Sequence, residues 1–126
     1  MPDRMQTLAL ALLCAPYLQG AALKLLDFRG AVAEVRGLGL APAAPLAAAT
    51  TALQLAAPAL ILSGWQRGLG ALALAGFTLL AAVLADRFWR ATGAERRRLG
   101  IAFCEHLALA GGLLLVACQD LGVLHA

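Results

Sequence analysis

The stretch Cys14-Ala-Pro-Tyr-Leu-Gln-Gly-Ala-Ala-Leu-Lys-Leu-Leu-Asp-Phe28 decides the fold of this chain. It is the second half of an apolar run that begins near Met5 and ends at a lysine and an aspartate. With offsets of three, four and three, one stripe of a helix here collects Tyr17, Gly20, Lys24 and Asp27. A polar stripe on an apolar segment must face protein or water rather than lipid. The stretch therefore predicts a membrane-spanning helix whose polar face points into a bundle.

The composition of the whole chain supports this prediction. Of its 126 residues, 62% are hydrophobic and only 13% are charged, and the mean hydropathy is +0.82. A soluble domain is about half apolar and about a quarter charged. The length leaves room for about four spans of roughly 20 residues each. We expect an all-α integral membrane four-helix bundle, one domain over residues 1–126, with spans at about residues 5–26, 46–62, 69–85 and 101–118.

The connections between the expected spans carry most of the charge. In the first, Phe28, Val32 and Val35 recur at helical spacing, which predicts a short amphipathic helix at the membrane interface. Glycines and prolines from Gly37 to Pro45 then end it. The last connection is expected over residues 91–100 and carries three consecutive arginines at positions 96–98.

The basic residues are distributed unevenly across the expected bilayer. Arg4 and Arg67 lie on the side of the termini, whereas the opposite side carries Lys24, Arg29, Arg36, Arg87, Arg90, Arg96, Arg97 and Arg98. Under the positive-inside rule, this bias predicts a multi-pass protein of the bacterial inner membrane with both long connections in the cytoplasm and both termini outside. Orientation in the lipid bilayer also explains the net charge of +3, so nucleic acid is not expected as a partner.

Seven polar or ionisable residues form a candidate ligand-binding cluster. Five are expected near the cytoplasmic end of the bundle, namely Lys24, Asp27, Asp86, Glu105 and His106, and two are expected deeper, namely Tyr17 and Gln54. A glutamine at the centre of a span must point inward, because lipid cannot satisfy its amide. Glu105 next to His106 inside a span is hard to explain as an ordinary boundary pair. The alternative for the others is a structural role, either as hydrogen-bonding contacts between helices or as side chains that reach water at the interface.

Cysteines and metals contribute little to the expected function. Cys104 and Cys118 lie about 21 Å apart on one helix, too far for a disulfide, and Cys14 with Cys118 is the least unfavourable pairing. Small buried thiols at helix interfaces are the favoured interpretation. Cys104, Glu105 and His106 are consecutive on a helix, so their side chains fan out and cannot converge on one metal ion.

Four segments in this order resemble the DoxX family of small bacterial four-helix membrane proteins. They are Leu-Gln-Gly-Ala-Ala-Leu-Lys-Leu-Leu-Asp-Phe at 18–28, Gly-Leu-Gly-Leu-Ala-Pro at 37–42, Leu-Gln-Leu-Ala-Ala-Pro-Ala-Leu-Ile-Leu at 53–62, and Leu-Ala-Leu-Ala-Gly-Gly-Leu-Leu-Leu at 107–115. The family's first-span pattern matches Gly20, Lys24, Leu25 and Asp27. Relatives often carry a glutamate at the position of Gln54, and Lys-Asn at the position of Glu105-His106. The neutral amide of Gln54 weakens any proton relay there.

Three kinds of function are open, and the resemblance implies the first of them. Relatives are similar to the small membrane subunit of thiosulfate:quinone oxidoreductase, and others to accessory membrane components of thiol-stress or metal-linked peptide pathways. The chain is thus expected to be a membrane subunit or accessory component of an oxidoreductase system, with a soluble or membrane oxidoreductase subunit as partner and a quinone headgroup as ligand. The alternatives are a non-catalytic scaffold or assembly factor, and a small-molecule or lipid transporter. A homodimer through an alanine- or glycine-rich face is a further alternative.

The sequence itself contains no self-contained catalytic or redox centre. Its two histidines, His106 and His125, lie at opposite ends of the last helix and cannot bracket a haem as a pair. It has no cysteine cluster for iron–sulfur ligation. No intrinsic cofactor is expected, so a redox partner would have to supply electrons.

Overall fold

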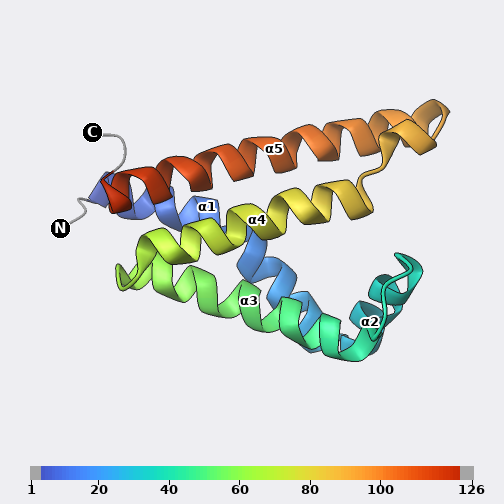
Figure 1. The fold of residues 1–126 in the computed structure, drawn as a ribbon, viewed down its shortest axis with the longest axis horizontal. Coiled ribbons are helices and arrows are strands. Elements are labelled where there is room, and N and C mark those ends of the chain that lie inside the picture. Colours follow the sequence, from blue (N-terminus) through green and yellow to red (C-terminus); the bar gives the residue numbers. More distant parts are fainter. Residues whose placement is uncertain (1–3, 123–126) are drawn as a thin grey trace.

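The computed structural model describes residues 4–122, and this part of the chain is helical with short connections (Figure 1). Its elements are α1 (Arg4–Leu26), α2 (Phe28–Gly37), α3 (Ala43–Ser63), α4 (Arg67–Ala85), the 3-10 helix η1 (Phe88–Arg90) and α5 (Gly93–Leu121). Four of the helices are long and apolar enough to cross a membrane. The expected all-α membrane bundle is therefore confirmed.

The short helix after the first span is also confirmed, and its start has a clear cause. Asp27 ends α1, and its carboxylate accepts a hydrogen bond from the backbone N–H of Gly30 at 3.0 Å. This side chain satisfies one of the free N–H groups at the start of α2. Ala31 is the buried residue of α2, while Arg29 and Arg36 are exposed. The helix is thus amphipathic, and it packs on α3.

The last helix begins earlier than the sequence analysis expected. Helix α5 starts at Gly93, so the arginines at positions 96–98 lie in its first turns and not in a connection. Arginine is a good helix former, and Glu95 in the first turn complements the helix dipole. With 29 residues, α5 is about 43 Å long, longer than a hydrocarbon core of about 30 Å. Its arginine-bearing turns therefore extend into the headgroup region.

The long helices pack in the ring order α1, α3, α4, α5. Between α1 and α5 the contact is brief. It includes the level of Leu13 and Gly112, where a Cβ on the glycine would lie 3.4 Å from a leucine methyl. The hydrophobic core lies entirely in the half of the bundle nearer the termini. Its buried members are Leu10, Cys14, Tyr17, Ala57, Ile61, Ala71, Leu74, Ala75, Leu113 and Ala117.

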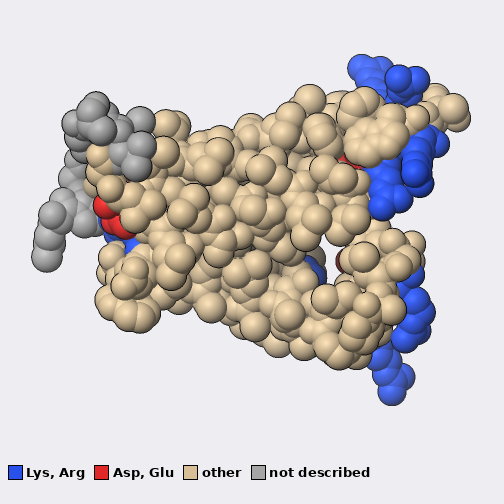
Figure 2. Space-filling view, viewed as in Figure 1, with Lys and Arg blue, Asp and Glu red and all other residues tan. Residues whose placement is uncertain are grey.

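Beyond that core the bundle separates into two arms. We call the end of α1 with α2 and the start of α3 the α1–α3 arm, and the end of α4 with η1 and the start of α5 the α4–α5 arm. Figure 2 shows an opening between the two arms, with basic and acidic atoms visible inside it. We call this opening the cleft. Within each arm the helices pack together through buried alanines. These are Ala21, Ala31 and Ala47 in the α1–α3 arm, and Ala82 and Ala110 in the α4–α5 arm.

The three cysteines are free and occupy different environments. Cys14 is fully buried in the core, as expected of a small apolar side chain. Cys118 is half-buried, and Cys104 is exposed on α5. The expectation that the thiols fill helix interfaces is wrong for Cys104, because it lies away from the buried row of α5, which consists of Ala110, Leu113 and Ala117.

Candidate functional site

The deepest polar contact joins α1 to α4 across the bundle. The hydroxyl of Tyr17 lies 2.5 Å from that of Thr78, and both side chains are buried. Thr78 donates its own proton to the carbonyl oxygen of Leu74 at 2.6 Å. A hydroxyl has one proton to give, so Tyr17 is the donor to Thr78. This contact lies where the hydrophobic core ends and the two arms begin to separate.

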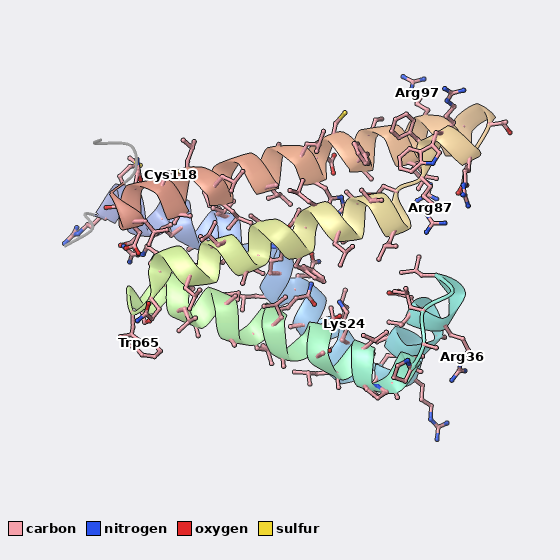
Figure 3. All side chains as sticks on the ribbon, in the orientation of Figure 1. Lys24, Arg36, Trp65, Arg87, Arg97 and Cys118 are labelled. Atoms are coloured by element: carbon pink, nitrogen blue, oxygen red, sulfur yellow. The ribbon has the colours of Figure 1, made fainter. Side chains whose placement is uncertain are left out.

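A second polar contact lies on the α1–α3 arm. The ammonium group of Lys24 donates a hydrogen bond to Oε1 of Gln54 at 2.8 Å. Gln54 belongs to the buried row of α3 and is 7% exposed. Gly20 makes room for its amide, because a Cβ at that position would come within 3.0 Å of the amide nitrogen. Figure 3 shows Lys24 pointing toward the cleft.

A third polar contact lies on the α4–α5 arm, between Asp86 and His106. Nδ1 of His106 lies 2.7 Å from a carboxylate oxygen of Asp86. The same nitrogen lies 2.8 Å from the carbonyl oxygen of Ala102, one turn earlier. The carboxylate oxygen has no partner that meets hydrogen-bond geometry. We therefore regard the pair as a close electrostatic contact in which the ring proton is directed at Ala102.

The burial of this pair sets it apart from ordinary boundary residues. The side chain of Asp86 is only 10% exposed and that of His106 is 34% exposed. His106 continues the buried row Ala110, Leu113 and Ala117 by one helical turn, so it lies on the inward side of α5. A buried carboxylate with an unsatisfied oxygen is unfavourable unless a positive group or a hydrogen-bond donor faces it. The nearest ionisable side chain is His106, whose Nδ1 lies 2.7 Å from this oxygen without meeting hydrogen-bond geometry.

Two of the seven candidate residues do not join these contacts. Asp27 is exposed and caps α2. Glu105 is exposed on α5, since it is about 100° around the helix from His106. His125 lies outside the described residues. The seven candidates therefore do not form one cluster. Five of them take part in three separate contacts, in which Tyr17 meets Thr78, Lys24 meets Gln54, and Asp86 meets His106. The other two are a helix cap, Asp27, and a surface carboxylate, Glu105.

A small pocket of about 260 Å³ lies beside the Lys24–Gln54 pair, between α1 and α2. It is lined by Gly20, Leu23, Lys24, Asp27, Gly30, Ala31 and Glu34. The carboxylates of Asp27 and Glu34 give this pocket a mixed charge. Within residues 4–122, no group of three or more histidine, cysteine or acidic side chains could hold a metal ion.

Thr78 is a functional candidate that the sequence analysis missed. It is the single threonine of the third expected span, residues 69–85, and it is not among the seven candidate residues. A hydroxyl in mid-span was the available signal, because it must bond to its own helix or to a neighbour. Thr78 does both, through Leu74 and Tyr17. Glu34 near Lys24 was missed as well, since no spacing rule relates the two helices.

The fold and these contacts define a small multi-pass membrane protein with polar side chains inside one half of its bundle. A family model, DoxX, matches residues 8–87, which is more than half of the chain. The chain belongs to the DoxX family. The match covers most of the first span and all of the second and third, and it ends just after Asp86, so it does not include His106. No curated protein and no solved structure matches the chain.

Proposed function

We propose that this DoxX-family protein is the membrane component of an oxidoreductase system and that its cleft binds the headgroup of a quinone. The observation that carries the proposal is the position of two polar contacts, Lys24–Gln54 and Asp86–His106. They lie on opposite arms, in the half of the bundle that has no shared hydrophobic core. Polar side chains inside a membrane bundle are retained where they meet a ligand, an ion or one another.

The chemistry of the two contacts suits a quinone. Each carbonyl oxygen of the ring accepts hydrogen bonds, and the site needs donors on both sides of the ring. Gln54 uses one of the three ammonium protons of Lys24, which leaves donors for a ligand on the α1–α3 arm. On the α4–α5 arm, Nε2 of His106 donates to a ligand only when the ring carries both protons, because the Nδ1 proton is directed at Ala102. The apolar tail of the ligand can leave between α1 and α5, which make only a brief contact.

Protons and electrons come from different sources in this proposal. A bound quinone supplies an acceptor for two electrons and two protons. His106, whose Nδ1 lies 2.7 Å from a carboxylate oxygen of Asp86, is the side chain of the α4–α5 arm that would exchange a proton with the ligand. Electrons enter from a partner oxidoreductase subunit that carries its own redox group. The protein's role is therefore binding, orientation and proton supply.

The same proposal places the chain in the bacterial inner membrane with the cleft toward the cytoplasm. The arginine-rich ends of α2 and α5 lie together at the end where the cleft opens (Figure 2). The positive-inside rule then puts both termini outside. We expect a C-terminal alkaline phosphatase fusion to be active and a C-terminal green fluorescent protein fusion to be dark. The reverse pattern would contradict the orientation.

Quinone binding is tested by purifying the protein in mild detergent from bacterial membranes and quantifying extracted quinone per protein. We expect quinone in near-stoichiometric amount, reduced at least tenfold by Gln54→Ala or His106→Ala; a tenfold loss corresponds to about 1.4 kcal/mol. The matched control is Gln19→Ala, because Gln19 is an exposed glutamine on α1. It should leave the quinone content unchanged.

Other outcomes would favour the alternatives. A stable partner subunit that copurifies without quinone would support a scaffold or assembly factor. Flux of a solute into proteoliposomes, lost in the same variants, would support a transporter. Equal quinone content in Gln54→Ala and Gln19→Ala would show that the quinone is carried along in the detergent micelle. That result would refute the cleft as the quinone site.

A further inference from the structure

A second feature, independent of the cleft, lies on the outer side of the α4–α5 arm. The start of α5 and η1 form an open groove of about 850 Å³. Its floor is apolar and comes from Phe88, Ile101, Phe103, Leu107 and Ala108. Arg96 and Arg97 lie at the end of the groove that is nearer the start of α5. The groove runs along α5 from the headgroup region into the depth of the hydrocarbon.

Aromatic packing gives the groove a fixed wall. The rings of Phe88 and Phe103 meet edge to face with centroids 5.5 Å apart. Trp89 packs against both, with centroids at 5.2 Å from Phe88 and 5.9 Å from Phe103. Such edge-to-face contacts add about 0.5–1.5 kcal/mol each beyond burial. These contacts hold the rings in place, so they do not fill the groove. Trp89, which is 48% exposed, lies beside the groove.

The two arginines that line the groove, Arg96 and Arg97, differ from the neighbouring Arg98 in their ion pairing. Arg98 forms an ion pair with Glu95 at 3.0 Å, and it does not line the groove. Within the described part of the chain, Arg96 and Arg97 have no carboxylate within ion-pair distance. Figure 3 shows Arg97 projecting from the first turns of α5. Two guanidinium groups therefore lie at one end of an apolar groove, and guanidinium groups pair well with phosphate through parallel hydrogen bonds.

Glu105 is the acidic residue of this groove, and its position limits its effect. It lies eight residues after Arg97, which is about 12 Å along the helix. At that separation Glu105 is out of reach of a phosphate held at the two arginines. The carboxylate therefore leaves this end of the groove positive.

We propose that this groove binds one anionic phospholipid, with its phosphate at Arg96 and Arg97 and an acyl chain along Phe103 and Leu107. Charge complementarity selects an anionic lipid over the zwitterionic lipids that surround any membrane protein. A bound lipid here would fix α5 at its depth and hold the α4–α5 arm beside the cleft.

The test uses Trp89 as a local reporter. Trp65 lies at the opposite end of the molecule, so Trp65→Phe leaves Trp89 as the single tryptophan of the chain. The full-length variant is reconstituted in phosphatidylcholine vesicles that contain either brominated phosphatidylglycerol or brominated phosphatidylcholine at equal fraction. Bromine quenches tryptophan fluorescence on contact. We expect the anionic lipid to quench Trp89 more strongly, with each arginine contributing roughly fivefold in relative affinity.

Matched variants separate the groove from general surface charge. Arg96→Ala and Arg97→Ala should each lower the preference roughly fivefold. Arg36→Ala removes the same charge at the same end of the protein but on α2, and it should leave the preference within about twofold. All three positions are exposed, so folding is retained. Equal quenching by the two lipids, or an equal effect of Arg36→Ala and Arg97→Ala, would overturn the proposal.

A second copy of the chain in the groove would give a different result. It would shield Trp89 from both brominated lipids, and oxidation would link the exposed thiol of Cys104 to that of its counterpart. That outcome would replace the lipid with a homodimer contact.

Discussion

Lys24 and Gln54 belong to different helices and meet through one hydrogen bond of 2.8 Å. The lysine ends the polar stripe of α1, and the glutamine lies on the buried row of α3. The contact ties the end of α1 to α3 at a depth where the hydrophobic core no longer holds the bundle together. The polar pair thus replaces apolar packing inside the α1–α3 arm.

The first prediction concerns this pair. Gln54→Leu should lower the free energy of unfolding by about 1–3 kcal/mol, because it leaves a half-buried ammonium group without its acceptor. Gln54→Glu keeps an oxygen acceptor of the same size and adds an opposite charge, so it should stay within about 1 kcal/mol of the native protein. The midpoint of denaturation in detergent measures both. Equal destabilisation by the two substitutions would contradict the assigned pairing.

The sequence predicted the inward direction of Lys24 and Gln54 but not their pairing. A polar stripe and a mid-span amide must face the inside of the bundle, because lipid offers no partners. Which two groups meet depends on how the helices rotate and cross, and no local pattern encodes that. For the same reason the predicted single cluster is three separate contacts.

The positions of Glu105 and His106 could have been separated from the sequence. Residues spaced four and three apart share a face, and the row Ala117, Leu113, Ala110 extends back to His106, not to Glu105. The start of α5 was missed for another reason. Charge was taken to end the span, whereas a helix can leave the membrane without ending, because water and headgroups tolerate its arginines.

A second prediction concerns the contact between Tyr17 and Thr78. Tyr17→Phe removes the donor and should lower the free energy of unfolding by about 0.6 kcal/mol, the average for such bonds in membrane proteins. Thr78→Val should cost about 1–3 kcal/mol, because it leaves the buried Tyr17 hydroxyl without an acceptor. The double variant should be less destabilised than the sum of the two. Strict additivity in the denaturation midpoints would show that the hydroxyls do not interact.

A third prediction concerns the start of α4, which is capped from another helix. Gln66 provides no side-chain cap, and a carboxylate oxygen of Asp120 on α5 accepts a hydrogen bond from the N–H of Gly68 at 2.7 Å. Asp120→Ala should therefore lower the free energy of unfolding by about 1 kcal/mol, as for other lost caps. The neighbouring Gln119→Ala is the matched control and should have little effect. Equal denaturation midpoints for the two variants would exclude the cap.

A fourth prediction compares two glycines of α4 that differ only in what surrounds them. A Cβ on Gly70 would lie 2.9 Å from the backbone carbonyl oxygen of Ala57 and 3.1 Å from the Cβ of Leu60, so α3 and α4 would have to separate. Gly76 has nothing within 4 Å of its Cβ position.

The two alanine substitutions should therefore act in opposite directions. Gly70→Ala should lower the free energy of unfolding by about 1–3 kcal/mol, because overpacking a close contact forces the helices apart. Gly76→Ala should raise it by up to about 1 kcal/mol through the higher helix propensity of alanine. Denaturation midpoints in the same detergent measure both. Stabilisation by Gly70→Ala would mean that α3 and α4 do not approach closely at this point. The hydrophobic core in the half of the bundle nearer the termini would then be less tightly packed than described above.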